Sequence, residues 1–379
     1  MYFDEAPKTQ REDLYDFEEQ FDLFKRALKR GTRLIAITGL RRTGKTSLLL
    51  TALNDSKLPY LVLDGRVFAN RATITRGDLV LALERSINDF VSRQKSWAQR
   101  ALDWLRKIRG VEVTLKPPKI SLAWGPSVRE AADIAQIFES LGRLAEKRKK
   151  KFVIAFDEAQ EFRKLVGYDL TMILAHVYDY VPGLQIVVTG SQIGLLRDFL
   201  GDENPKAPLF GRFRVDIVLP HLDRERSREF LELGFKQVEM KPGEKIVGEI
   251  LGELDGVIGW LAFVGARAST CGKIDDATLE QVFAEGARLA ASELENFFVG
   301  REVARKRYAI ILSELSKSPR RWSELKSSLE IKEGKHISNQ ILSGLLGKLV
   351  KAGFVRKSVE GIYSAMDPLL KRAIRSGFV

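Results

Sequence analysis

The feature that most constrains this chain is a glycine-bounded octapeptide near its N-terminus. Residues 39–46 read GLRRTGKT and fit the pattern G-x-x-x-x-G-K-[ST], in which glycines allow successive backbone N–H groups to turn toward a phosphate. The run 33–38 before it has a strand pattern and 47–53 after it is helical, so a helix N-terminus points at the same place. A chance glycine turn is the alternative, and the flanking strand and helix disfavour it. We therefore expect a phosphate-binding loop.

The side chains of this loop have separate expected roles. Lys45 is expected to reach the β- and γ-phosphates of a nucleoside triphosphate, and the hydroxyl group of Thr46 to be a ligand of Mg²⁺. The remaining contacts between the loop and the nucleotide are expected from Gly39, Arg42, Thr43, Gly44 and Ser47.

A second motif lies about a hundred residues further along the chain. The apolar run FVIAF at 152–156 ends in Asp157 and Glu158, and a buried strand that ends in two acids makes sense where a cation lies at its tip. Asp157 is expected to hold Mg²⁺ together with Thr46, and Glu158 to polarise the attacking water. An ordinary solvated strand end is the alternative. The chain contains no N-K-x-D stretch for reading guanine, so we expect ATP rather than GTP.

Strand patterns alternate with helical patterns in the first 220 residues. This alternation predicts an α/β fold, a parallel P-loop ATPase sheet with helices on both faces. The strand 60–64 falls between the phosphate loop and Asp157 in the sequence. Together with Glu158, this order is typical of the P-loop ATPases in which an extra strand separates the two motifs in the sheet. The predicted strands are 33–38, 60–64, 152–156, 185–189 and 214–219.

An insert and two C-terminal units complete the predicted organisation. The insert, at about 95–127, contains a basic helix and a hairpin, with Trp104 and Trp124 beside basic residues. It is either a platform for a partner or nucleic acid, or a decoration whose tryptophans simply pack. Three helices followed by a hairpin at the C-terminus predict a winged helix. The expected units are a P-loop ATPase core at 1–222, a helical lid at 223–300 and a winged-helix domain at 301–379.

Charge is distributed unevenly along the chain. The protein carries a formal net charge of +12, and residues 301–379 contain 17 Lys and Arg against 7 Asp and Glu, a net charge of +10. This asymmetry favours a module that binds a partner such as duplex DNA, with a solvated basic face as the alternative. The single Cys271 fits a reducing compartment, and no signal peptide or membrane span is evident. We expect a cytoplasmic protein without a membrane partner.

The order of P-loop, Asp-Glu strand, helical lid and winged helix resembles the archaeal ATPase family. That family lies near the AAA+ and STAND classes and is similar to archaeal replication-initiator ATPases. The most specific shared stretches are GLRRTGKTS, FVIAFDEAQ, VVTGSQ at 187–192 and PLFGRF at 208–213. The resemblance implies that Thr189 or Ser191 is the polar sensor of the γ-phosphate. It also implies that Arg212 compensates charge in the transition state, in cis or from a neighbouring subunit.

Two stretches depart from the family pattern, and both lie near the adenine side of the site in relatives. Family members commonly carry Gly-Arg-Glu near the first helix, where this chain has DFE at 16–18. They often place a proline in a Gly-x-Pro turn of the lid, where this chain has GVIGW at 256–260. The contacts with the base, and the coupling of the lid to the nucleotide, are therefore left open.

These expectations combine into a Mg²⁺-dependent ATPase that binds ATP and ADP and moves its lid and winged helix with nucleotide state. The favoured output is DNA binding through residues 301–379, with little sequence preference, because the recognition helix offers no arginine suited to guanine. One alternative is a STAND-like signalling switch whose winged helix contacts a client protein or clamps the nucleotide. Another is a nucleotide binder with little turnover. The client and the oligomeric state are open. The expected buried stripe of the recognition helix is Ile341, Leu342, Leu345, Leu346 and Leu349.

Overall fold

The structure is a computed structural model that describes residues 1–379 except 116–117, 124–132, 255 and 379. The strands are β1 Leu34–Gly39, β2 Tyr60–Asp64, β3 Val111–Leu115, β4 Pro118–Leu122, β5 Phe152–Asp157, β6 Leu184–Gly190, β7 Val215–Leu219, β8 Arg320–Arg321, β9 Val355–Lys357 and β10 Ile362–Ala365. The helices are α1 Glu18–Arg30, α2 Lys45–Ser56, α3 Arg76–Arg93, α4 Lys95–Leu105, α5 Ile134–Lys147, α6 Leu170–Tyr180, α7 Ile193–Leu200, α8 Arg224–Gln237, α9 Glu244–Leu254, α10 Ile258–Cys271, α11 Asp276–Phe298, α12 Arg305–Lys317, α13 Trp322–Glu333, α14 Asn339–Lys351 and α15 Pro368–Arg375.

The central sheet has five strands in the order β2-β5-β6-β1-β7, and each neighbouring pair is parallel. β6 lies between β1, which leads into the phosphate loop, and β5, which ends in Asp157. This order confirms the predicted α/β fold and the predicted extra strand between the two motifs. Because the carboxyl ends of parallel strands meet at one edge of a sheet, the residues that follow β1, β5 and β6 come together there.

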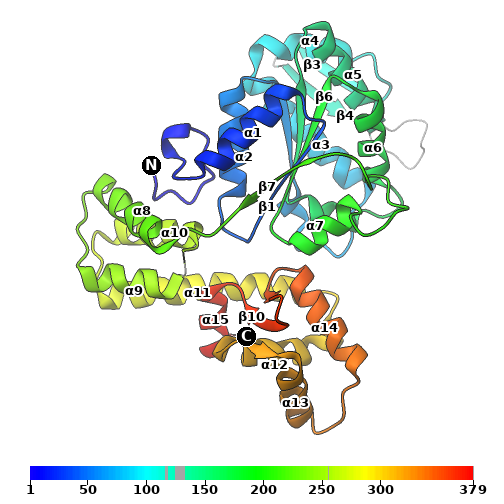
Figure 1. The fold of residues 1–379 in the computed structure, drawn as a ribbon. Coiled ribbons are helices and arrows are strands. Elements are labelled where there is room, and N and C mark those ends of the chain that lie inside the picture. The colour runs from blue at the N-terminus through cyan, green and yellow to red at the C-terminus, as the bar shows by residue number, and fades with distance from the viewer. Residues whose placement is uncertain (116–117, 124–132, 255, 379) are drawn as a thin grey trace.

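Each face of the sheet has its own apolar core, since successive strand residues point to opposite faces. Ile35 and Ile37 belong to the core that α1 and α2 cover, whereas Leu34 and Ala36 belong to the core under α3, α5 and α6. The first of these cores continues without a break into α8–α14. Figure 1 shows α11–α14 below the sheet. The lid and the winged helix are therefore packed against the ATPase core. The divisions at 222/223 and 300/301 fall between elements and stay predictions.

The insert consists of α4 and the antiparallel hairpin of β3 and β4. The hairpin is anchored to α3 by Asn88, whose side chain exchanges hydrogen bonds of 2.8 and 3.0 Å with the backbone of Ile120. Trp97 is buried under the Arg148 guanidinium group, 4.2 Å from its ring, and Trp104 packs partly against the core. Trp124 and the end of the insert lie outside the described residues. The two described tryptophans of the insert thus pack, as the plainer interpretation predicts.

Three helices, α12–α14, and the small sheet β8-β10-β9 form the predicted winged helix, and α15, which was not predicted, follows it. Leu342, Leu345, Leu346 and Leu349 of α14 are buried as expected, but Ile341 is 42% exposed. The prediction for Ile341 is wrong because the four leucines already fill the i, i+3, i+4, i+7 stripe, and Ile341 lies on its flank. Throughout the described residues, every helix is too short or too polar to span a membrane.

Candidate active site

The phosphate loop occupies the turn between β1 and α2, as its sequence predicts. β1 ends at Gly39 and α2 begins at Lys45, so the N-terminus of α2 faces the loop. Gly44 has a φ of 89°, a left-handed conformation that a side chain would strain. The hydroxyl group of Thr43 donates a 2.9 Å hydrogen bond to the carbonyl oxygen of Leu40. The loop is therefore held in a curled form before any phosphate binds.

Lys45 is buried at the floor of the loop and is 4% exposed. Its Nζ donates a 2.6 Å hydrogen bond to the carbonyl oxygen of Leu40. Burial lowers the pKa of Lys45, and the charges of Glu158 and Asp157 oppose this shift. Among the described residues, the buried ammonium group donates to this one carbonyl, so a phosphate oxygen would stabilise it strongly and the side chain is prepared for an anion.

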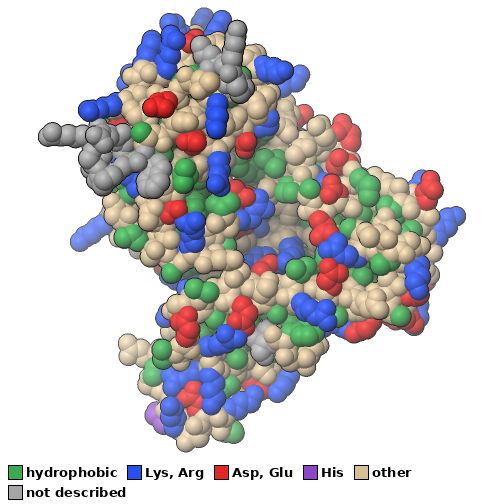
Figure 2. Space-filling model, turned by 180° about the vertical axis from the view of Figure 1, so that it is seen from behind, with side chains coloured by type: hydrophobic (Ala, Val, Ile, Leu, Met, Phe, Trp, Pro, Cys, Tyr) green, Lys and Arg blue, Asp and Glu red, His purple; other side chains and the backbone are tan. Residues whose placement is uncertain are grey.

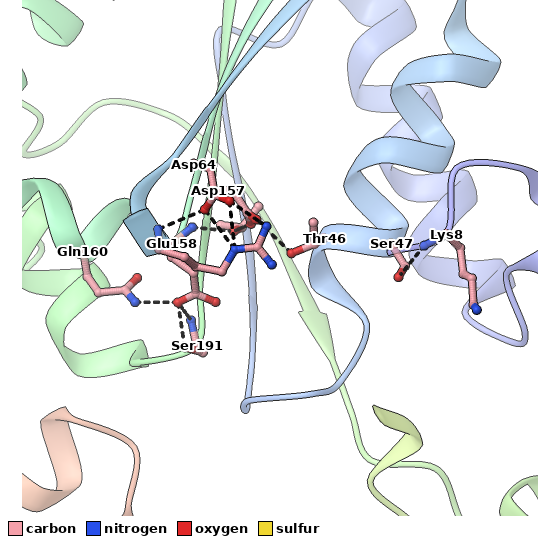
Figure 3. A network of polar contacts seen from close by, with 10 residues as sticks. Lys8, Thr46, Ser47, Asp64, Asp157, Glu158, Gln160 and Ser191 are labelled. Atoms are coloured by element: carbon pink, nitrogen blue, oxygen red, sulfur yellow. Dashed lines mark hydrogen bonds and ion pairs between the residues drawn. The ribbon is translucent and has the colours of Figure 1, made fainter. Parts of the chain in front are cut away.

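Asp157 joins the phosphate loop to β6 through its two carboxylate oxygens (Figure 3). Its Oδ2 accepts a 2.8 Å hydrogen bond from Oγ1 of Thr46, and its Oδ1 accepts one from Oγ1 of Thr189. Burial, together with the charge of Glu158, raises the pKa of Asp157, while Thr189, Arg66 and Thr46 oppose that rise. The structure thus brings three residues predicted for the site, Thr46, Asp157 and Thr189, into direct contact.

Glu158 is the acceptor of a second hydrogen-bond network (Figure 3). Its Oε2 accepts hydrogen bonds from Oγ and N of Ser191, at 2.6 and 3.1 Å, and from Nε2 of Gln160 at 2.5 Å. Burial alone would raise the pKa of Glu158, but Lys45 and these hydrogen bonds hold it below its ordinary value. The carboxylate is therefore ionised, as a group that accepts a proton from water must be.

The oxygen atoms around Asp157 suit Mg²⁺, which usually binds through one or two protein ligands and takes the rest from phosphate and water. Oγ1 of Thr46 and Oδ2 of Asp157 are 2.8 Å apart, close enough to be ligands of one ion. Among the described residues no group of three or more His, Cys, Asp and Glu is arranged to hold a metal. This donor set fits a metal that arrives with a nucleotide.

A cavity of about 970 Å³ opens onto these residues, a size typical of nucleotide and other ligand sites. Lys45, Thr46 and Glu158 lie on its core side, the lid contributes Trp260, and the winged helix contributes Lys348. Figure 2 shows the hollow between the ATPase lobe and the helices beside and below it. All three predicted units therefore line one cavity.

Glu293 of α11 binds both arginines of the phosphate loop. Its Oε1 is 2.5 Å from Nη2 of Arg42, and its Oε2 is 2.9 Å from Nη1 of Arg41. The Arg41 guanidinium group also lies 4.7 Å from the ring of Phe354, next to the wing. Arg42 was predicted to contact the nucleotide. It lines the cavity, but its guanidinium group forms an ion pair with Glu293 of the lid.

Trp260 and Asp367 also contact Arg42, so the phosphate loop, the lid and the winged helix meet at a junction formed by Arg41, Arg42, Glu293, Trp260 and Asp367. The Arg42 guanidinium group lies 3.8 Å from the ring of Trp260, and its Nη1 is 3.7 Å from Oδ2 of Asp367. Nε1 of Trp260 donates to both carboxylate oxygens of Asp367, at 3.2 and 3.1 Å. The backbone N of Gly259 donates a 2.9 Å hydrogen bond to the carbonyl oxygen of Arg42. The phosphate loop is thus tied directly to the lid and to the start of α15.

Comparisons with known proteins agree with this geometry. Residues 14–262 match the family model of an ATPase domain found predominantly in Archaea. The chain belongs to the archaeal ATPase family. Residues 302–366 match the C-terminal winged helix-turn-helix domain of MCM proteins.

Two solved structures resemble this chain over nearly its whole length. The Walker-type ATPase of Pyrococcus abyssi is 30% identical with a TM-score of 0.80, over 99% of this chain and 100% of that one. The ORC2 protein of Aeropyrum pernix, solved as ADPNP–ADP complexes, is 14% identical with a TM-score of 0.57, over 99% and 95% of the two chains. A comparison with curated proteins finds no match. The chain is therefore a P-loop ATP hydrolase with a C-terminal winged helix.

Arg212 lies outside the lining of the cavity. Its Nη2 and Nε bind Asp179 at 2.5 and 3.2 Å, and its Nη1 donates to the carbonyl oxygen of Pro208. In the part of the chain that the structure describes, Arg212 is not among the residues that line the cavity. The geometry therefore gives no support to a role in cis, and a role in trans stays a prediction.

The two departures from the family pattern both contact the phosphate loop. Asp16 and Phe17 have φ values of 58° and 65°, and the Phe17 ring packs beside Gly44. Asp16 pairs with Arg226 of the lid, so this segment joins the core to α8. Gly259 supplies the backbone hydrogen bond to Arg42 described above. Both stretches thus keep a structural link between the lid and the loop without the family's usual residues.

The sequence motifs assign no role to several residues at the site. Gln160 ends the stretch FVIAFDEAQ, Arg66 follows β2 without a motif, and Glu293 and Asp367 are separated from the loop by about 250 residues or more. The strand ends were a usable signal, since a polar residue just after a parallel strand faces the ligand edge of the sheet. Glu293 and Asp367 had no such signal, because only the tertiary packing of α11 and α15 brings them near the loop.

Proposed function

We propose that this chain is a Mg²⁺-dependent ATP-hydrolysing switch that couples nucleotide state to DNA binding through its winged helix. Lys45 binds the β- and γ-phosphates, whose oxygens replace the Leu40 carbonyl as acceptors for its Nζ. Glu158 accepts a proton from the attacking water, and Ser191 and Thr189 sense the γ-phosphate through their contacts with Glu158 and Asp157. When bound, Mg²⁺ would be held by Thr46 and Asp157 and would neutralise charge on the β- and γ-phosphates.

The observation that carries the coupling is the junction of Arg41 and Arg42 with Glu293 and Asp367. These arginines belong to the loop that binds phosphate, whereas their partners belong to the lid and the winged helix. A nucleotide that shifts the loop must shift or break these ion pairs, and a ligand that alters them must shift the loop. The proposal is therefore that ATP and ADP favour different positions of the lid and winged helix.

DNA is the favoured partner of the moving domain for two reasons. Residues 301–379 carry +10 of the net charge, and residues 302–366 resemble the winged helix-turn-helix of MCM proteins. The C-terminal end of α14 is docked on α7, where Nζ of Lys351 is 2.9 Å from Oδ1 of Asp198, while Asn339 and Ser343 are exposed. A nucleotide state that releases this end would present the whole helix to a duplex.

The test uses the full-length chain with a duplex in the presence of ADP, of a non-hydrolysable ATP analogue, or of neither. A switch predicts DNA affinities that differ between the ADP and ATP-analogue states by about fivefold or more. The variant Arg42→Ala should abolish the difference while both states still bind DNA. Equal affinities in all states would refute the switch, and absence of binding even at low salt would refute DNA as the partner.

A second function is favoured by the position of the winged helix beside the cavity. Lys348, Lys351 and Ala352 of the winged helix line the cavity. In this alternative, the domain clamps the nucleotide and releases a protein-binding surface, as in a STAND-like signalling switch. Nucleotide affinity then depends on Lys348, whereas the DNA-binding switch does not require this. Isothermal titration of ADP into Lys348→Ala separates the two functions.

For Arg212 we propose a role only from a neighbouring subunit. Its present partner, Asp179, would have to release it, and the guanidinium group would then act on the phosphates of another copy. The prediction is a turnover that rises more steeply than protein concentration in the wild type and linearly in Arg212→Ala. Strict proportionality in the wild type would exclude this role.

A further inference from the structure

The segment that follows β2 places an arginine, Arg66, in the cavity near Lys45 and Glu158. Asp64, the last residue of β2, pairs in register with Asp157 of β5, so the two carboxylates lie side by side (Figure 3). Two residues later, Arg66 lines the same cavity as Lys45 and Glu158.

Arg66 is held by both carboxylates. Its Nε and Nη2 bind Oδ1 and Oδ2 of Asp64 at 2.9 and 2.8 Å, and its backbone N donates to Oδ1 at 2.9 Å. The same Nη2 is 3.5 Å from Oδ2 of Asp157, the oxygen that accepts the hydrogen bond from Thr46. The guanidinium charge therefore lies beside Asp157 and Thr46, which are expected to hold the Mg²⁺ that accompanies the γ-phosphate.

The backbone fixes this position as firmly as the ion pairs do. A Cβ on Gly65 would lie 2.6 Å from the carbonyl oxygen of Glu158 and 2.9 Å from that of Asp157. Such a contact is too short for any side chain, so only glycine allows the chain after β2 to pass this close to the two acids. Arg66 is thus delivered to the site by a turn that is packed directly on the Asp157–Glu158 peptide.

The guanidinium group keeps donors for a ligand. An arginine has five N–H donors, and within the described residues Asp64 takes only those of Nε and Nη2 as hydrogen bonds, so Nη1 donates none. The side chain is 51% exposed, on the cavity. A cation anchored on one edge and open on the other is suited to bidentate binding of a phosphate.

We propose that Arg66 binds the γ-phosphate of ATP in cis and is a catalytic residue of the hydrolysis. It supplies from within the chain the charge compensation that the family resemblance had suggested for Arg212. Asp64 acts as a positioning residue that holds Nε so that Nη1 faces the phosphate. This inference rests on the roles proposed for Lys45, Thr46 and Asp157, which place the γ-phosphate at this end of the cavity.

The test compares Arg66→Ala with Arg66→Lys and with the control Arg71→Ala. Arg71 lies in the same segment but pairs with Asp78 and is not among the described residues that line the cavity. For each variant, affinities for a non-hydrolysable ATP analogue and for ADP are measured by titration calorimetry, and kcat and KM by phosphate release. Thermal unfolding of each variant verifies that it is folded.

Arg66→Ala should weaken the ATP analogue about tenfold and lower kcat about 10²-fold, as loss of a transition-state charge partner does. ADP affinity should not change, because ADP lacks the phosphate that Arg66 binds. Arg66→Lys should recover part of the preference for the ATP analogue over ADP, since lysine keeps the charge but lacks the bidentate donors of arginine. Arg71→Ala should behave as the wild type.

Three outcomes would overturn the inference. ATP and ADP affinities that fall together would make Arg66 a structural clamp, and an unchanged kcat would remove it from the reaction. An Arg71→Ala variant with the same loss of ATP preference would assign the effect to the segment. Lys45→Ala, measured alongside, should lose both nucleotides. If it does so while Arg66→Ala changes nothing, the site is correct and only this inference fails.

Discussion

The two faces of the phosphate loop use similar residues for different purposes. On the inner face, Lys45 and Thr46 meet Asp157 and Glu158 within the ATPase core. On the outer face, Arg41 and Arg42 meet Glu293 and Asp367, which belong to the lid and the winged helix. The inner-face partners both lie at the end of β5, whereas the outer-face partners come from separate units. The inner face is thus built for chemistry and the outer face for communication.

The contrast can be tested first by removing the inner cation. Lys45→Ala should abolish tight ATP binding, because no other mobile cation of the loop is directed at the β- and γ-phosphates. Titration calorimetry with ATP analogue and ADP measures the effect, and Arg41→Ala is the matched control from the outer face. Arg41→Ala should retain ADP affinity within about threefold, since Arg41 is engaged by Glu293. Equal losses in the two variants would erase the distinction between the faces.

The next largest effect is expected at the carboxylate of the inner face. Glu158→Gln should bind ATP nearly as well as the wild type and hydrolyse it about 10²-fold more slowly, because an amide cannot accept the proton from water. Single-turnover phosphate release measures the step directly. Adding a chelator to the wild type should likewise stop turnover and leave ADP bound, if Thr46 and Asp157 hold the metal. A wild-type rate in Glu158→Gln would show that another group activates the water.

On the outer face, the expected effect is on stability and not on chemistry. Arg42→Ala should lower the free energy of unfolding by about 2 kcal/mol, because it removes a half-buried ion pair with Glu293 and a cation–π contact with Trp260. Glu293→Gln should reproduce part of this loss. Denaturant unfolding of the two variants, monitored by tryptophan fluorescence, provides the measurement. Unchanged stability would mean that the junction contributes little to domain contact.

The same contrast explains what could be predicted from the sequence. The loop, the Asp-Glu strand and the alternation of strands and helices are local patterns, so the sheet and the placement of Thr46 and Asp157 followed from them. Thr189, Ser191 and Arg212 were proposed from resemblance alone, and the surroundings of Arg212 in this chain do not favour a role in cis. The error at Ile341 is smaller. The sequence pattern alone does not show that an apolar residue beside a complete buried stripe is exposed.

The contacts of Glu293 and Asp367 with the phosphate loop could not be predicted from the sequence, for a physical reason. The partner of a loop arginine is decided by how α11 and α15 pack, and packing depends on the shapes of many apolar side chains at once. Neither Glu293 nor Asp367 stands in a pattern that distinguishes it from other acids of the chain. Asp367 is also the N-cap of α15, and its side chain accepts a 3.0 Å hydrogen bond from the backbone N of Leu370. The helix α15 was not predicted from the sequence.

The smallest effect is expected furthest from the loop, at the wing. If the full-length protein binds duplex DNA through several phosphates, log affinity should fall linearly with log salt, by about 0.9 per phosphate neutralised. Arg356 and Lys357 are exposed on β9, and changing both to Ala should flatten that slope by up to about two units and weaken all sequences alike.

The matched control for the wing is the pair Lys332 and Lys335, which lie in the same domain but are already bound to Glu314 and Glu333. Because these lysines are neutralised within the protein, their change to Ala should leave the slope nearly unaltered. The measurement is a DNA titration at three salt concentrations for each double variant. An equal change in slope for both pairs would mean that the domain acts only through its total charge. An unchanged slope in the wing variant would place the DNA contact elsewhere, and the outer face of the phosphate loop would then be coupled to a partner that does not use the wing.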